Sequence, residues 1–231
     1  MSELTEVIRR TFSLETWEVI LPAIGDTLYM TSLSTLLMAV LGLILGTALF
    51  VTRPDGLRPV RVFYALFGAV INALRSLPSM VIIILTLPLA KLIIGRSIGP
   101  GAVIIALALT CIPMFARMVE GSFLEVPRGK LEAAKSIGAR NWELVLKVAL
   151  PEALPGLIRN FTIAVIAVIS VTALAGFFGG GGLGDVAVRF GYNRFLTHMM
   201  VAAVLALIVI VELVQLGGDA WAKHIVRKRH L

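Results

Sequence analysis

Long apolar runs separated by short polar segments dominate this sequence. Each of five runs is about 20 residues or longer, enough for a helix to cross a hydrocarbon core about 30 Å thick. Because the bilayer core supplies no water to backbone N–H and C=O groups, a span has to satisfy these groups internally, as an α-helix does. The pattern therefore predicts an all-α, polytopic transmembrane helical bundle, formed by a single domain over residues 1–231. The five predicted spans cover about 28–51, 62–89, 101–119, 157–178 and 199–216.

Individual residues refine two of these elements. Apolar residues recur at helical spacing ahead of the first run, which predicts a short interfacial helix over about 14–22 with Trp17 at the depth of the lipid headgroups. Proline lacks a backbone N–H, so Pro78 and Pro88 are expected to interrupt the second span.

The composition supports a membrane protein and explains its charge. The chain has 231 residues, of which 58% are hydrophobic and 15% charged, and its mean hydropathy is +0.94. A soluble domain of this composition would have too little polar surface to cover itself. The net charge of +7 would suggest nucleic acid in a soluble protein, but here the basic residues fall in loops between spans. We therefore expect the lipid bilayer, and no nucleic acid, as a partner.

Basic residues are distributed unevenly between the two sets of loops that alternate along the chain. Cytoplasmic loops of membrane proteins carry an excess of Lys and Arg. The asymmetry here predicts an N-terminus outside, a cytoplasmic C-terminus and a cytoplasmic loop over about 120–156. One set holds 14 of the 21 basic residues, namely Arg53, Arg58, Arg61, Arg117, Arg128, Lys130, Lys135, Arg140, Lys147, Arg159, Lys223, Arg227, Lys228 and Arg229. The other set holds Arg9, Arg10, Lys91, Arg96, Arg189 and Arg194, and Arg75 falls within a predicted span.

The polar segment between the third and fourth runs is amphipathic, which places it at a membrane surface. Leu131, Ala134 and Ile137 recur at helical spacing and form an apolar stripe. Gly138 fits the end of this helix, because glycine adopts the left-handed conformation without a Cβ penalty.

A second helix is predicted to follow this turn. Asn141 can cap its first turn, and Pro151 fits its end. Residues 128–158 are therefore expected to form a helix–turn–helix.

The core of this segment is Glu132-Ala133-Ala134, followed by Gly138 and later by Leu150-Pro151, and it resembles the EAA loop of ABC-importer permeases. Further strings extend the likeness from about Thr27 to the end of the chain. On these strings the chain resembles the permease subunit of methionine ABC importers, which has the type I importer fold. The strings are VTRP at 51–54, LRSLPS at 74–79, ARMVEGSFLEVP at 116–127, ALPEALPGLI at 149–158, GGGGLGDVAVRFGY at 179–192 and GGD at 217–219.

The resemblance implies a division of labour between several chains. This chain would be a non-catalytic permease subunit in the bacterial inner membrane, where it would form a homodimer. Two subunits of an ABC ATPase would dock on the two EAA loops and bind ATP-Mg, so this chain itself would hold no cofactor. A periplasmic or lipoprotein substrate-binding protein would deliver methionine, including D-methionine and close analogues. The implied coupling residues are Leu131, Glu132, Ala133, Ala134, Lys135, Gly138, Ala139, Leu150 and Pro151.

Two departures from the family's pattern leave the substrate open. Ser79-Met80 follow the RSLP string where an aromatic residue is usual, and Asp185 follows GLG where a neutral residue is usual. A permease of the same fold for a polar amino acid or a quaternary amine is therefore one alternative. A secondary transporter without an ATPase is another, and it would show inverted repeats and broken helices with intramembrane ions.

Arg75 is a charge placed well inside a predicted span. Charge in lipid is costly, so Arg75, Ser76 and Pro78 are candidates for a gate or for the translocation pathway. Helix packing, or snorkelling of the long Arg75 side chain to the interface, would also account for it. Glu212 in the fifth run admits a proton relay or packing against a neighbouring helix or headgroup.

The sequence contains no pattern typical of catalysis, nucleotide binding or metal coordination. The run from Gly179 to Gly184 lacks the Gly-Lys-Ser/Thr ending of a phosphate loop. We interpret it as an extracytoplasmic turn that needs small residues for flexibility or for contact with a substrate-delivering protein. His198, His224 and His230 have no ligand spacing with cysteine or carboxylates, so no metal site is expected.

Overall fold

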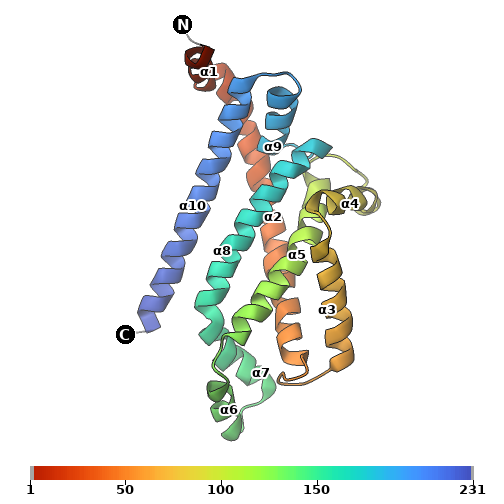
Figure 1. The fold of residues 1–231 in the computed structure, drawn as a ribbon, viewed down its shortest axis with the longest axis vertical. Helices are drawn as coiled ribbons and strands as arrows, with labels where there is room; N and C mark the ends of the chain where they lie inside the picture. Colours follow the sequence, from red (N-terminus) through yellow and green to blue (C-terminus); the bar gives the residue numbers. More distant parts are fainter. Residues whose placement is uncertain (1–2, 230–231) are drawn as a thin grey trace. The chain divides into compact units, whose positions relative to one another are not determined.

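The computed structural model describes residues 3–229, and all regular elements within that range are helical. The predicted all-α class is therefore confirmed (Figure 1). The α-helices are α1 (Glu3–Thr11), α2 (Leu14–Thr52), α3 (Arg61–Ser76), α4 (Ser79–Ile94), α5 (Pro100–Leu124), α6 (Arg128–Ser136), α7 (Asn141–Glu143), α8 (Leu150–Ala175), α9 (Gly182–Val186) and α10 (Thr197–Arg229). Between them lie the π-helical turns η1 (Leu144–Ala149) and η3 (Ala187–Tyr192) and the 3₁₀ turn η2 (Gly176–Phe178).

Four stretches of the described chain are helical, long and apolar enough to cross a membrane by themselves. They are Leu14–Thr52, Pro100–Leu124, Asn141–Phe178 and Thr197–Arg227. The helices α3 and α4 meet the same criteria only when taken together, and the chain bends by 109° between them. This count of four, or five with the broken pair, agrees with the five predicted spans.

The break between α3 and α4 lies at Leu77 and Pro78. Leu77 has an extended backbone with φ −78° and ψ 137°, which a following proline favours because its Cδ clashes with a helical neighbour. The predicted interruption at Pro78 is thus confirmed. The interruption predicted at Pro88 is wrong, because α4 continues to Ile94. Helices in membranes tolerate proline where local adjustment satisfies the carbonyl that it frees.

The separate interfacial helix predicted over 14–22 is wrong. These residues form the first turns of the continuous α2, although Pro22 lies inside it. Ile20 is fully buried, and Trp17 packs against the same apolar cluster. Because this cluster includes residues of α9 and α10, tertiary packing favours a helix that continues through these residues. The short separate helix at this end of the chain is α1.

Two compact units share the chain. The first comprises Met1–Leu36, Pro78–Thr110 and Val165–Gln215, and the second comprises Leu37–Leu77, Cys111–Ala164 and Leu216–Leu231. In the first unit, side chains from the beginning of α2, from α9 and from the beginning of α10 are buried against one another. This buried cluster of the first unit consists of Ile20, Ala23, Leu183, Val186, Ala202, Ala203 and Ala206.

The second unit holds α2, α3 and α5 in close contact. Leu49, Ile71 and Ala116 form a buried cluster between them. A Cβ at Gly46 would overlap the Ala116 carbonyl and lie 2.6 Å from the Val119 side chain. Only glycine therefore allows α2 to approach α5 this closely.

Arg117 was expected in a cytoplasmic loop, but it lies inside α5 and belongs to a buried polar network. Its Nη1 donates to Glu120 Oε2 at 2.7 Å, and its Nη2 donates to the Gly68 carbonyl oxygen at 3.1 Å. Tyr64 Oη donates to the other Glu120 oxygen at 3.1 Å. The side chains of Arg117 and Glu120 are only 18% and 6% exposed. Assigning Arg117 to a loop was wrong because a buried carboxylate three residues on makes its charge tolerable within the helix.

Replacing Glu120 with glutamine is expected to destabilise the protein by about 3 kcal/mol or more, because it leaves the buried Arg117 charge without its partner. The loss should lower the temperature of helix unfolding measured by circular dichroism in detergent. Glu6→Gln is the matched control, since Glu6 pairs with Arg10 at an exposed site, where ion pairs contribute about 0–1 kcal/mol. Equal unfolding temperatures for the two variants would contradict a stabilising role for the network.

Candidate functional site

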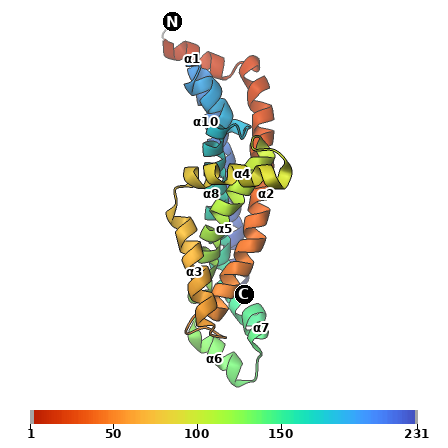
Figure 2. The ribbon, with the colours of Figure 1, turned by 90° about the vertical axis from the view of Figure 1, so that its right-hand side faces the viewer.

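The polar segment predicted to form a helix–turn–helix begins with α6. Pro127 precedes it with φ −57° and ψ 123°, and the helix then runs from Arg128 to Ser136. Within the second unit, α6 lies beside the loop that joins α2 to α3 (Figures 1 and 2). The segment therefore packs against a neighbouring loop at its start.

Gly138 terminates α6 in the left-handed conformation that the sequence predicts, with φ +89°. Its N–H donates to the Lys135 carbonyl at 3.0 Å, and the N–H of Ala139 donates to the Ala134 carbonyl at 3.2 Å. These two bonds form a Schellman motif, which satisfies carbonyls that the helix end would otherwise leave free. A Cβ at Gly138 would meet no atom within 4 Å, so its backbone conformation, and not space, requires glycine.

The faces of α6 differ in part from the predicted stripe. Leu131 and Ala134 are half-buried as expected, but Ile137 is 86% exposed. The prediction for Ile137 is wrong because this residue is already the C-cap, where the helical periodicity ends. Among the predicted coupling residues of α6 and the turn after it, Glu132, Ala133, Lys135 and Gly138 are exposed and Ala139 is half-buried. Together with Ile137 they make an uncovered surface of mixed polar and apolar character.

The second helix of the segment, called the second arm below, begins with α7 at Asn141, but Asn141 is not its N-cap. Arg140 occupies the cap position with an extended backbone, and its N–H donates to Glu143 Oε2 at 3.0 Å. The same carboxylate accepts a bond from Lys147 Nζ at 2.9 Å. The predicted Asn141 cap is therefore wrong, since the carboxylate of Glu143 reaches back to the free N–H from inside the first turn.

The sequence predicted that the second helix of the segment ends at Pro151, but this prediction is wrong. The π-helical turn η1 carries the chain directly into α8, which starts at Leu150 and continues to Ala175. The Leu150 N–H donates to the Val145 carbonyl, five residues back. Such a wide turn shifts the hydrogen-bond register just before Pro151, so the missing proline N–H no longer breaks the helix. Leu150 is half-buried and Pro151 is exposed.

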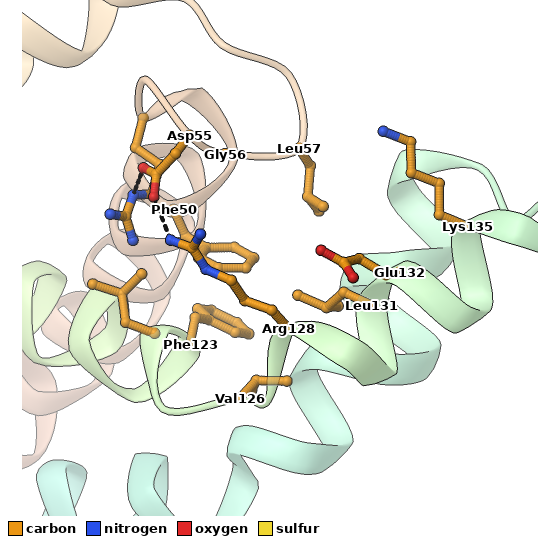
Figure 3. A pocket seen from close by; sticks show the side chains of 12 residues that line it. Phe50, Asp55, Gly56, Leu57, Phe123, Val126, Arg128, Leu131, Glu132 and Lys135 are labelled. Atoms are coloured by element: carbon orange, nitrogen blue, oxygen red, sulfur yellow. Dashed lines mark hydrogen bonds and ion pairs between the residues drawn. The ribbon is translucent and has the colours of Figure 1, made fainter.

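A groove of about 220 Å³ lies between α6 and the end of α2 (Figure 3). Its apolar floor includes Phe50 and Phe123, which stack with ring centroids 5.0 Å apart. Leu131, Glu132 and Lys135 of α6 form one wall. The structure thus brings three of the predicted coupling residues to one concave surface.

Asp55 links the α2–α3 loop to the start of α6. Its carboxylate contacts Arg53 Nε and Arg128 Nη2, each at 2.6 Å (Figure 3). Desolvation opposes ionisation of Asp55, but its backbone hydrogen bond and the two guanidinium groups outweigh it, so the pKa is lowered from the ordinary value of 3.8. The carboxylate is therefore charged at neutral pH, and this link would weaken only as the pH falls through that lowered pKa. Asp55 was not predicted as a site residue. Its partner Arg128 lies 73 residues further along the chain, so the sequence does not indicate that the two form an ion pair.

Two further contacts attach the segment to the flanking helices. Lys130 of α6 forms an ion pair with Glu152 in the first turn of α8. Asn160 Nδ2 donates to Ser122 Oγ at 2.8 Å and so joins α8 to α5 just before the segment begins. The segment is thereby held at both of its ends.

The candidate gate residues gather at the break between α3 and α4. Arg75 lies exposed in the last turn of α3, and Ser76 Oγ donates to the Ala73 carbonyl at 2.7 Å. Pro78 occupies the N-cap position of α4. Arg75 forms no ion pair with any described residue, and none of the three lines the groove beside α6.

The glycine-rich run is packed into the first unit. A Cβ at Gly182, where φ is +76°, would lie 2.6 Å from Thr27 Oγ1. The same hydroxyl accepts a hydrogen bond from the Leu183 N–H at 2.9 Å. Close backbone approach to α2 therefore explains glycine at this position, a reason that the sequence alone did not supply. Asp185, the departure from the family pattern, pairs with Arg189 at 2.9 Å.

The remaining polar candidates are separate from one another. Glu212 is exposed on α10, as is His224, and the His198 carbonyl accepts a bond from Thr11 Oγ1 at 3.4 Å. His230 lies outside the described residues. Among the residues that the structure describes, no group of three His, Cys, Asp or Glu side chains could hold a metal ion.

The chain is similar to known proteins in sequence and in structure. Residues 38–230 match the family described as binding-protein-dependent transport system inner membrane component. The chain is 40% identical over 218 residues to a probable D-methionine transport system permease protein, MetI, of Vibrio cholerae serotype O1. This match covers 94% of this chain and 96% of the relative. It is 39% identical over 171 residues to the methionine import system permease protein MetP of Bacillus subtilis strain 168, covering 74% and 77%.

A solved structure of the MetNI methionine ABC transporter in an inward-facing conformation contains a chain of the same fold. The TM-score is 0.90 with 34% identity, and the match covers 93% of this chain and 99% of that chain. The predicted type I importer permease fold is thereby confirmed.

Proposed function

The chain belongs to the family of binding-protein-dependent transport system inner membrane components, and from that premise we propose that it is the permease subunit of an ATP-driven methionine importer. It is a multi-pass protein of the inner membrane. The permease relatives are named for methionine or D-methionine transport, and the structural neighbour is a methionine ABC transporter. Methionine, including the D-isomer and close analogues, is accordingly the proposed substrate.

The exposed face of α6 is the observation that carries the proposed coupling role. Glu132, Ala133 and Lys135 are exposed on a helix that a Schellman motif and two ion pairs hold in place. A rigid helix with an uncovered face suits docking into a separate protein, because little conformational freedom is lost on binding. We assign this face to a partner ATPase.

The proposed mechanism transmits force through the described contacts. Closure of two ATPase subunits on ATP would draw together α6 from each of two copies of this chain. Lys130–Glu152 and Arg128–Asp55 would pass the displacement to α8 and to the α2–α3 loop. The spans would then turn outward to receive methionine from a substrate-binding protein. ATP-Mg belongs to the partner ATPase in this scheme, and this chain is non-catalytic and holds no cofactor.

The orientation completes the proposal and is testable on its own. The basic asymmetry supports a cytoplasmic location for α6 and the C-terminus and an N-terminus outside. In a Cys111→Ala background, an impermeant thiol reagent should label Leu4→Cys in intact cells and Ser136→Cys only after permeabilisation, since Leu4 and Ser136 are both exposed. Labelling of Ser136→Cys from outside would overturn the orientation and the coupling role with it.

The substrate is tested by uptake in cells that lack other methionine transporters. Supplied with this chain, its ATPase and its binding protein, such cells are expected to accumulate labelled methionine, because the permease relatives are named for that solute. Omission of the ATPase is the control and should abolish accumulation. Uptake of another amino acid that excess methionine fails to compete away would reject the substrate and leave the importer class standing.

The coupling role is tested at Gly138. Valine there would cost about 1–2 kcal/mol, because side-chain-bearing residues disfavour the left-handed conformation, whereas asparagine visits it readily. We expect Gly138→Val to reach the membrane in normal amounts, to retain less ATPase on co-purification and to lose ATP-driven uptake. Gly138→Asn is the matched control and should keep most of both. Wild-type transport by Gly138→Val with the ATPase still bound would show that α6 is not the coupling element.

A further inference from the structure

An apolar groove separate from the one in Figure 3 runs along the end of α2. Its volume is about 600 Å³. Ile44, Ala48 and Val51 line it on α2, and Val145 and Leu146 line it on η1. The groove therefore connects a membrane-spanning helix with the second arm of the coupling segment.

The burial of its lining shows a dry floor and an apolar mouth. Phe123 and Val145 are 1% and 8% exposed, whereas Ile44 and Leu146 are 60% and 54% exposed. Thr52, a polar member of the lining, already donates its hydroxyl to the Ala48 carbonyl at 2.7 Å. An occupant would consequently find many apolar contacts and few hydrogen-bond partners.

The only charged residue among those lining the groove is Arg58. It is exposed, and it follows Thr52, where α2 ends. Helical rise sets the distance from Leu43 to Thr52 at about 14 Å, which is close to half of a hydrocarbon core about 30 Å thick. The groove thus has the length that one acyl chain spans in one leaflet. The positively charged Arg58 lies just beyond the end of α2, the helix that lines the groove.

We propose that this groove binds a phospholipid with an anionic headgroup. An acyl chain lies along Ile44, Ala48 and Val51, and the phosphate lies at Arg58. An extended peptide segment fits less well, because its backbone N–H and C=O groups would be buried against a lining that does not satisfy them. The assignment of this lipid to the cytoplasmic leaflet rests on the orientation proposed above, but the binding itself does not.

The test is native mass spectrometry of the purified full-length chain in detergent, titrated with phosphatidylglycerol or with phosphatidylcholine. One phosphatidylglycerol per chain is expected to bind about fivefold more tightly than phosphatidylcholine, as one Arg near a headgroup implies. Arg58→Gln should abolish this preference and leave the weaker binding of both lipids. Arg61→Gln is the matched control, since Arg61 is exposed in the same region but does not line the groove.

A second pair of variants tests the acyl site itself. Ala48→Phe should fill the groove and remove binding of both lipids, while Leu41→Phe, at an exposed position of α2 outside the groove, should retain it. Equal lipid preference in Arg58→Gln and Arg61→Gln, or wild-type binding in Ala48→Phe, would overturn the proposal. Occupation of the groove by a polypeptide or a second copy of the chain would overturn it as well. None of these readouts depends on transport, so failure here is distinct from failure of the proposed importer.

Discussion

The packing of the helices depends on polar groups among apolar side chains that find partners within the chain. Threonine hydroxyls do so by bonding to the carbonyl four residues earlier, as Thr27, Thr110 and Thr162 show at 2.8–3.0 Å. Arg117 does so through Glu120 and the Gly68 carbonyl, and in doing so ties α5 to α3. Because no water replaces such bonds in lipid, those that run between helices, as from Arg117 to Gly68, help to fix which helices pack together.

The segment that contains α6 and α7 is joined tightly to the spans. Only the stretch from Glu125 to Pro127 separates α5 from α6, and no break separates α7 from α8. Ion pairs at Arg128 and Lys130 then link α6 to the elements beside it. Stiff joints of this kind suit a part whose proposed role is to convert the movement of one protein into the movement of another.

The sequence predicted what depends on composition and local periodicity. The all-helical class, the break at Pro78 and the left-handed turn at Gly138 follow from apolar length and from backbone stereochemistry, and the structure confirms all three. One error occurred where residues distant in sequence decide the outcome. Packing of Ile20 on α9 and α10 extended α2 beyond the expected start.

Local alternatives caused the remaining errors. The carboxylate of Glu143 replaced the expected cap, and a wide turn absorbed Pro151. Neither outcome is readable from residue preferences alone. The pairs Asp55–Arg128 and Lys130–Glu152 are likewise set by how the chain folds back on itself.

The wide turn η1 has a consequence for how the second arm is aimed. An α-helix advances by about 100° per residue, so one residue added to or removed from the six residues of η1 would rotate everything before it by roughly that angle about the axis of α8. The rotation would leave the span itself untouched. The number of residues between α7 and the span therefore sets the direction in which Trp142 and Lys147 point. An insertion or deletion in this stretch would change that direction more than a substitution would.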